Sequence, residues 1–128
     1  KRTLDVRTAE IALAVERDGN LAVADGNKIR RITPHGEVST LRDAGIRFGR
    51  LDGIACDRAG NLYAADRELH IIWKVTPKGE VCRLGSSGLA MGGSGWLVTG
   101  LAVDRAGNVY VSDAVRNCII RGVPQRRR

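Results

Sequence analysis

Short apolar runs recur along the chain and alternate with polar turns. Runs of this length, bounded by Gly, Asn and Asp, predict β-strands joined by tight turns rather than helices. Each turn between the first two runs of a unit begins with a carboxylate, which can accept backbone N–H groups, and carries glycine in fourth place, where a positive φ is needed. The predicted first strands begin at 13, 54 and 101, and the second strands cover 21–24, 62–65 and 109–112.

The chain repeats itself three times. Aligning Leu13 with Ile54 and Leu101 superimposes thirteen consecutive positions without a gap. The two offsets are 41 and 47 residues, which is the length of a four-stranded propeller blade. Five aligned positions are identical in all copies: Ala14, Ala55 and Ala102; Arg17, Arg58 and Arg105; Gly19, Gly60 and Gly107; Asn20, Asn61 and Asn108; and Asp25, Asp66 and Asp113.

Each unit continues into further strands. Turns at 33–36 and 76–79 place proline second and glycine fourth, which favours a β-turn before a fourth strand. The third copy breaks off after Pro124 into glutamine and arginines, so we expect the N-terminal residues Thr3 and Leu4, which match Thr40 and Leu41, to replace its fourth strand. The predicted third strands are 29–32, 71–75 and 118–121, with Arg31, Lys74 and Arg121 in one column, and the fourth strands are 38–41 and 81–84.

These segments resemble the NHL-repeat β-propeller family. The resemblance is carried by 54–66 with 70–77 and by 101–113 with 117–121, and it covers roughly residues 11–124. It implies an all-β fold, a β-propeller of NHL type with three four-stranded blades per chain, half of a six-bladed ring. The first copy departs from the pattern at Glu16 and in a shorter loop, where Asn27 stands in place of His70. We expect one module, 1–128, with repeats at about 11–41, 52–84 and 99–124 and with 1–10 as the candidate for a closing outer strand.

Three blades would form an open arc whose two terminal faces are uncovered, which is a stability problem. The family usually closes a ring of about six blades, as the resemblance implies. Two hypotheses stay open. Either two chains pair as a homodimer that completes one six-bladed ring, or the chain is part of a longer propeller.

In a propeller, the connections between blades and the loops from second to third strand share one face, which we call the loop face. Exposed aromatic side chains beside arginines suit contact with a protein or peptide. Alternatively, Phe48 and Trp96 pack between blades. We therefore predict a non-catalytic binding or scaffold module, without a cofactor, that recognises a protein or peptide partner. The predicted contact residues are Arg47, Phe48, Arg50 and Asp52 in the connection 42–53 and Met91 and Trp96 in the connection 85–100.

Propellers of similar appearance include lactone hydrolases and lyases that hold a metal in the central channel. The resemblance therefore leaves a metal-dependent lactone hydrolase or lyase as the alternative function. Asp52, just before an inner strand, is the best carboxylate at the channel mouth, although it could also cap the turn into Gly53. His35 and His70 fall in different parts of the repeat, so they form no three-histidine zinc set. Each aligned segment of thirteen residues ends in an aspartate, Asp25, Asp66 or Asp113. We expect these aspartates to cap the loops that they begin.

The net charge of +7 is a weak sign of a nucleic-acid partner. Lys1, Arg2 and the arginines at 126–128 supply five of the positive charges, so residues 3–125 carry 16 − 14 = +2. RNA binding stays a third hypothesis, which requires the loop arginines to form a continuous patch. The recurring arginines in the first turns are expected to be solvated on the face opposite the loop face, with a basic partner surface as the alternative.

Cysteine spacing and hydropathy narrow the class of protein further. The chain has three cysteines, Cys56, Cys82 and Cys118, and no two of them form a Cys-x-x-Cys pair. This spacing favours buried free thiols over a disulfide or a metal site. No apolar run approaches the length of a membrane span, so we expect a soluble chain with no membrane partner. The sequence leaves the compartment open.

Overall fold

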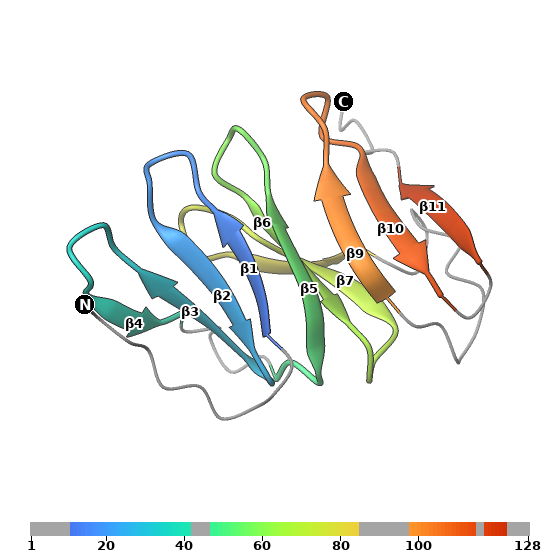
Figure 1. The fold of residues 1–128 in the computed structure, drawn as a ribbon, viewed down its shortest axis with the longest axis horizontal. Helices are drawn as coiled ribbons and strands as arrows, with labels where there is room; N and C mark the ends of the chain where they lie inside the picture. The colour runs from blue at the N-terminus through green and yellow to red at the C-terminus, as the bar shows by residue number, and fades with distance from the viewer. Residues whose placement is uncertain (1–10, 42–46, 85–97, 115–116, 123–128) are drawn as a thin grey trace.

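The computed structural model describes residues 11–41, 47–84, 98–114 and 117–122, which form only strands, turns and loops. Eleven strands in these ranges make three antiparallel sheets (Figure 1). No helix in these ranges is long and apolar enough to cross a membrane. The strands are β1 (Ile11–Val15), β2 (Leu21–Asp25), β3 (Lys28–Ile32), β4 (Val38–Thr40), β5 (Leu51–Cys56), β6 (Leu62–Asp66), β7 (Ile71–Val75), β8 (Val81–Leu84), β9 (Val98–Val103), β10 (Val109–Asp113) and β11 (Cys118–Gly122).

The three sheets are arranged as the blades of a β-propeller. In each sheet, neighbouring strands follow one another in the chain, and β1, β5 and β9 lie side by side at the centre (Figure 1). We call β1–β4 blade 1, β5–β8 blade 2 and β9–β11 blade 3. The predicted all-β propeller fold is confirmed. Blades 1 and 2 have four strands, and blade 3 has three among the described residues; the segment containing Thr3 and Leu4 lies outside those residues.

The first turn of every blade has the predicted geometry. Gly19, Gly60 and Gly107 have φ angles of 90°, 90° and 85°, a region that glycine adopts without strain. In each turn the glycine N–H donates to the carbonyl of the acidic residue three positions earlier, at 2.9 to 3.2 Å. The shared turn therefore sets the hairpin shape in all three copies.

Strand alternation sends side chains to two separate cores. Ala22, Ile29 and other blade 1 residues meet Leu51, Leu62 and Trp73 of blade 2 in the larger cluster. On the other side of blade 2, Tyr63, Ala65 and Ile72 meet Val109 and Val111 of blade 3. Full burial of a large apolar side chain stabilises a fold by about 1.5–3 kcal/mol, so packing between blades holds the arc together.

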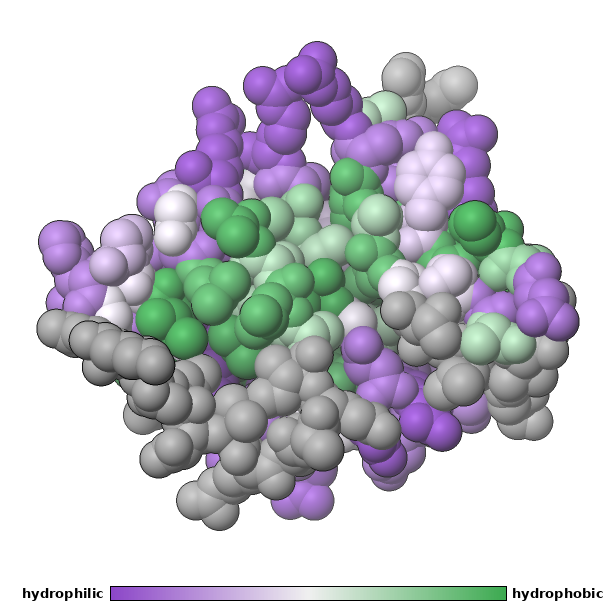
Figure 2. All heavy atoms as spheres, in the orientation of Figure 1, coloured by the Kyte–Doolittle hydropathy of each residue, from purple (hydrophilic) through white to green (hydrophobic). Residues whose placement is uncertain are grey.

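The outer flanks of the arc remain apolar and exposed. Ala12 and Ala14 pack toward blade 2, so Leu13 and Val15 point to the other side of β1 and are 59% and 70% exposed. Ile119 on β11 is 73% exposed. Figure 2 shows apolar surface gathered across the face turned toward the viewer, over the inner strands of Figure 1. These are the surfaces that further blades would cover.

The three cysteines are free, as predicted, but two of them are not buried. Cys56 is half-buried on the inner strand β5, whereas Cys82 and Cys118 are exposed. The prediction of buried thiols is wrong for these two because β8 and β11 are the outermost described strands of their blades. An outermost strand has fewer neighbours to cover its side chains.

Candidate functional site

Asp66 organises the loop face of blade 2. Its carboxylate is fully buried and accepts hydrogen bonds from the N–H groups of Glu68 and Leu69 at 3.1 and 3.0 Å. The predicted loop-capping role is therefore confirmed for this aspartate. The same carboxylate also accepts hydrogen bonds from the N–H groups of Gly49 and Arg50, at 2.7 and 3.1 Å. Asp66 thus fixes the end of the connection that enters blade 2, a role that the repeat pattern does not indicate.

The connection passes so close to Asp66 that residue 49 must be small. A Cβ at Gly49 would lie 2.6 Å from Asp66 Oδ1 and 2.8 Å from the Glu68 Cβ. Two further backbone bonds hold this segment: Arg67 N donates to Arg50 O at 2.8 Å, and Leu51 N donates to Gly26 O at 2.8 Å. The backbone at 49–51 is therefore tied to the second-to-third-strand loops of both blade 2 and blade 1.

Phe48 belongs to the core and not to the surface of the loop face. Its side chain is 5% exposed, and its ring packs edge-on against Trp73, with centroids 5.3 Å apart and an angle of 73° between planes. Trp73 in turn donates from Nε1 to Asp66 at 2.8 Å. The alternative that Phe48 packs between blades is confirmed, and the prediction that Phe48 is a surface contact residue is wrong. The reason is that Asp66 holds the adjacent backbone at Gly49 in a position from which the Phe48 ring points into the core.

Three charged residues meet at the start of β5, and we call them the loop-face cluster: Arg50, Asp52 and Arg67. Arg50 Nε lies 3.5 Å from one Asp52 oxygen, and Arg67 Nη1 lies 3.7 Å from the other. The Asp52 side chain is only 8% exposed, while the two arginine side chains are 46% and 41% exposed. The cluster itself holds two exposed guanidinium groups and one carboxylate, and the buried carboxylate of Asp66 lies beside it, bonded to the Arg50 N–H. Arg47, nearby in the chain, is also exposed.

Asp52 owes its position to a β-bulge. Leu51 pairs with Asp66 and Gly53 pairs with Ala65, so Asp52 is the extra residue in the ladder. A bulge leaves its residue outside the regular pairing and re-aims the side chain. Blade 3 shows a register shift at the same place, between Gly100 and Val98. In blade 1, by contrast, the first strand runs in regular register up to Asp25.

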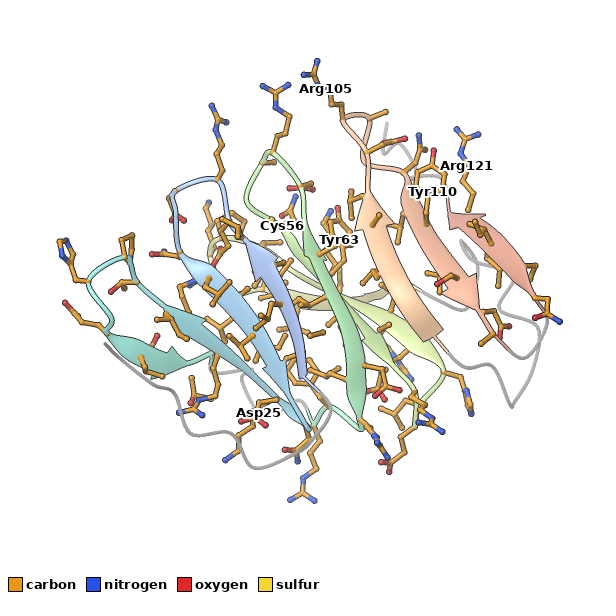
Figure 3. All side chains as sticks on the ribbon, viewed as in Figure 1. Asp25, Cys56, Tyr63, Arg105, Tyr110 and Arg121 are labelled. Carbon is orange, nitrogen blue, oxygen red and sulfur yellow. The ribbon has the colours of Figure 1, made fainter. Side chains whose placement is uncertain are left out.

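Asp25 and Asp113 end β2 and β10 as Asp66 ends β6. Asp25 pairs with Arg30 at 3.5 Å, and Asp113 is buried. Figure 3 shows Asp25 at the loop-face end of its blade. Met91 and Trp96 lie outside the described residues. Arg67 was not singled out in the sequence, since only the fold shows that the loop after Asp66 lies against β5.

A divalent metal does not fit the residues described at the loop face. Those residues contain no group of three or more His, Cys, Asp or Glu side chains that could hold a metal ion. Asp52, the predicted channel carboxylate, is flanked by two guanidinium groups, which repel a metal cation.

The loops between second and third strands share a left-handed backbone residue. His70 has a φ of 57°, and Asn117, at the equivalent position of blade 3, has a φ of 52°. In the shorter loop of blade 1, Gly26 takes this conformation.

Comparison with solved structures places the chain among propellers. The chain is similar to a streptogramin B lyase, with 17% identity and a TM-score of 0.69 over 87% of this chain and 36% of the lyase. It is also similar to a catalytically inactive virginiamycin B lyase from Staphylococcus aureus with quinupristin, with 16% identity and a TM-score of 0.65 over 88% and 40% of the two chains. A gluconolactonase from Xanthomonas campestris shows 15% identity and a TM-score of 0.55 over 88% and 61%.

At these identities the likeness shows the fold alone, and the fold is that of a β-propeller. The chain spans less than two thirds of the length of each of these structures. Neither the family models nor the curated proteins give a match to this sequence.

Proposed function

We propose that this chain is a non-catalytic propeller module of NHL type that binds a protein or peptide partner at its loop face. The supporting observation is the segment at 47–52. It offers the exposed side chains of Arg47 and Arg50 on a backbone that Asp66 holds by two hydrogen bonds. Contact residues on a preorganised backbone lose little conformational entropy on binding.

The two exposed guanidinium groups of the loop-face cluster indicate which chemical groups such a partner would present. Arg50 and Arg67 are each more than 40% exposed beside a nearly buried Asp52. Guanidinium groups bind carboxylates through paired hydrogen bonds, so acidic side chains or a peptide C-terminus are the groups that we expect at the cluster. Met91 and Trp96 are proposed to supply the apolar part of the contact.

The test is a selection of peptides from a phage-displayed library on the full chain, followed by affinity measurements on the peptides obtained. The double variant Arg47→Gln/Arg50→Gln should bind them at least about tenfold more weakly, since charge-assisted hydrogen bonds are lost. Lys78→Gln, which removes an exposed charge from the turn between β7 and β8, at the end of blade 2 opposite the loop face, should leave the affinity unchanged. Equal affinity of the double variant, or peptides that bind elsewhere, would contradict the proposal.

A lactone hydrolase or lyase is the second candidate. The similar folds include lyases and a gluconolactonase, and Asp52 lies at a bulge at the start of an inner strand. If a metal takes part, its site needs at least one ligand from outside the described residues, which hold no group of three. Turnover of gluconolactone or of a streptogramin B by the full chain, with and without added divalent ions, tests this candidate. Activity that Asp52→Asn abolishes would favour the enzyme over the binding module.

We also propose that a second copy of the chain completes the ring. Leu13, Val15 and Ile119 leave apolar surface on the two terminal flanks, while the lyases that share the fold are more than twice the length covered by this chain. Two copies supply six blades, and each terminal flank then meets a flank of the partner. The alternative cover is further blades of a longer chain.

A further inference from the structure

Three arginines stand together at the end of the molecule opposite the loop face. Arg17, Arg58 and Arg105 occupy the same place in the first turns of the three blades. Because β1, β5 and β9 lie side by side, these turns are neighbours. A pocket of about 490 Å³ opens between them, lined by the three arginines, by Asp57 and Asp104, and by Val103 among other residues. Figure 3 shows Arg105 projecting outward from its turn, at the opposite end from Asp25.

The carboxylates beside these arginines are engaged within their own blades. Asp57 accepts hydrogen bonds from the Asn61 side chain and the Tyr63 hydroxyl, both at 2.9 Å. Asp104 makes the same contacts with Asn108 at 2.8 Å and Tyr110 at 2.9 Å. These bonds satisfy the two carboxylates within their own blades, and both aspartates also line the pocket.

A cation stands at one equivalent position of every third strand, and in blade 1 it pairs with the turn carboxylate. Arg31, Lys74 and Arg121 are the cross-strand partners of Ala22, Tyr63 and Tyr110. Arg31 forms an ion pair with Glu16 at 2.6 Å, and Lys74 Nζ lies 6.0 Å from the centroid of the Tyr63 ring. Among the described residues, Glu16 is the turn carboxylate that has such an ion pair. The pocket itself is lined by three arginines and two aspartates, so its formal charge is 3 − 2 = +1.

One more carboxylate lies in these turns, and it has its own partner. Asp18 accepts hydrogen bonds from the backbone and side chain of Asn20 at 3.1 and 3.0 Å, and its counterparts in the other blades are Ala59 and Ala106. Within the described residues, no ion pair joins a turn arginine to a carboxylate. Arg17 instead donates to the carbonyl of Arg58 at 3.2 Å, which spans the gap between blades 1 and 2.

We propose that Arg17, Arg58 and Arg105 form a binding site for an organic anion. The guanidinium groups would hold a carboxylate or phosphate group by paired hydrogen bonds, and the apolar body of the ligand would lie against Val103. This site goes beyond the proposed loop-face function because it lies at the other end of the sheets and uses none of the same residues.

The experiment is a titration of the full chain followed by heteronuclear NMR, at an ionic strength kept constant with sodium chloride. Phenyl phosphate and benzoate probe the two anionic groups on an apolar body, and inorganic phosphate and acetate are the matched probes without that body. We expect saturable shifts at the amides of 16–20, 57–61 and 104–108, and tighter binding of the aromatic probe in at least one pair. Tighter binding of phenyl phosphate than of benzoate would indicate a phosphate ligand, and the reverse order would indicate a carboxylate ligand.

Variants tie the binding to the arginines. The triple variant Arg17→Gln/Arg58→Gln/Arg105→Gln should lower the affinity at least about tenfold, and each single variant should lower it less. Lys28→Gln, which makes the same change of one charge as a single variant but at the other end of blade 1, should retain it. If the triple variant does not fold, the single variants carry the test, since each exposed side chain can be replaced alone. Absence of saturable shifts, or equal losses in Lys28→Gln, would overturn the proposal.

Discussion

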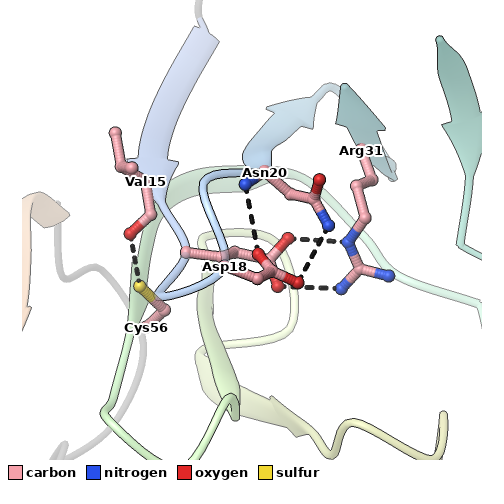
Figure 4. A network of polar contacts seen from close by, with 6 residues as sticks. Val15, Asp18, Asn20, Arg31 and Cys56 are labelled. Atoms are coloured by element: carbon pink, nitrogen blue, oxygen red, sulfur yellow. Dashed lines mark hydrogen bonds and ion pairs between the residues drawn. The ribbon is translucent and has the colours of Figure 1, made fainter. Parts of the chain in front are cut away.

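The first turns of blades 1 and 2 share one backbone but satisfy their carboxylates differently. In blade 2, Asp57 bonds to Asn61 of its own turn and to the hydroxyl of Tyr63. In blade 1, Ala22 occupies the position of Tyr63. The longer Glu16 reaches past that position to Arg31 on the third strand, with two bonds of 2.6 and 3.0 Å (Figure 4).

This difference shows which part of the repeat the fold requires. The positive-φ glycine and the backbone bonds of the turn are kept in all copies, whereas the partner of the carboxylate is exchanged. An unsatisfied buried carboxylate is costly, so the loss of the tyrosine is offset by one longer side chain and an arginine. The hydrogen bond to Glu16 raises the pKa of Arg31, as expected for a cation that gains a partner.

The largest effect is expected at Asp66, whose carboxylate accepts hydrogen bonds from the connection, from its own loop and from Trp73. Asp66→Ala leaves the N–H groups of Gly49 and Arg50 and the indole of Trp73 without their acceptor. Because these groups lie in or against the core, the free energy of unfolding should fall by about 3–5 kcal/mol. Urea denaturation followed by circular dichroism measures the loss. Asp18→Ala, at an exposed turn of blade 1, should change stability little; comparable losses would contradict the assigned role of Asp66.

The two ways of holding a turn carboxylate can be compared directly by substitution. Glu16→Gln replaces a charged, nearly buried partner of Arg31 and should cost about 1–3 kcal/mol. Tyr63→Phe removes one hydroxyl and leaves Asp57 bonded to Asn61, so we expect about 1 kcal/mol. Thermal unfolding of both variants gives the order. A larger loss for Tyr63→Phe would show that the tyrosine, and not the ion pair, is the stronger arrangement.

The turn carboxylate of blade 2 should also make the stability of the protein depend on pH in acid. Burial by itself raises the pKa of Asp57, but hydrogen bonds from Asn61, Tyr63 and the Ala59 N–H hold that pKa below its usual range. A carboxyl whose pKa is lower in the folded state contributes stability above its unfolded pKa of about 3.9, and this contribution is lost as the pH falls through the folded pKa.

Asp57→Asn should therefore lose less stability than the wild-type protein when the pH is lowered through this range. The measurement is the urea midpoint of both proteins at neutral and at acidic pH. Burial and the hydrogen bond to Asp57 also raise the pKa of Tyr63, so its ionisation should not interfere at either pH. An identical pH dependence of wild type and variant would contradict the hydrogen-bond network drawn for blade 2.

The smallest effect concerns the thiol between these two blades. Cys56 Sγ donates to the carbonyl of Val15 at 2.9 Å (Figure 4), and burial raises the pKa of Cys56. Since the thiolate is the reactive form, alkylation by iodoacetamide near neutral pH should reach the exposed Cys82 and Cys118 before Cys56. Mass spectrometry of partly modified protein gives the order. Equal rates at all three would show that the contact between blades 1 and 2 is open in solution.

Local repetition made the fold predictable, because turn chemistry and strand alternation act over a few residues. The glycine turns, the strands and the loop cap at Asp66 all follow from neighbouring positions in the repeat. The inward turn of Phe48 and the pairing of Asp52 with Arg67 depend on contacts between segments that the repeat does not relate. Nor does the sequence show that the turn arginines share one pocket, since this requires the three inner strands to be adjacent.

The central claim is that these blades form one arc of a closed ring whose terminal flanks need cover. The solution mass of the folded full chain, from light scattering coupled to size exclusion, tests it most directly. With a second copy completing the ring, the account predicts twice the 13.8 kDa of one chain, and a charge at Leu13 or Ile119 should break the assembly. A stable, monodisperse monomer with the apolar flanks left open would contradict it.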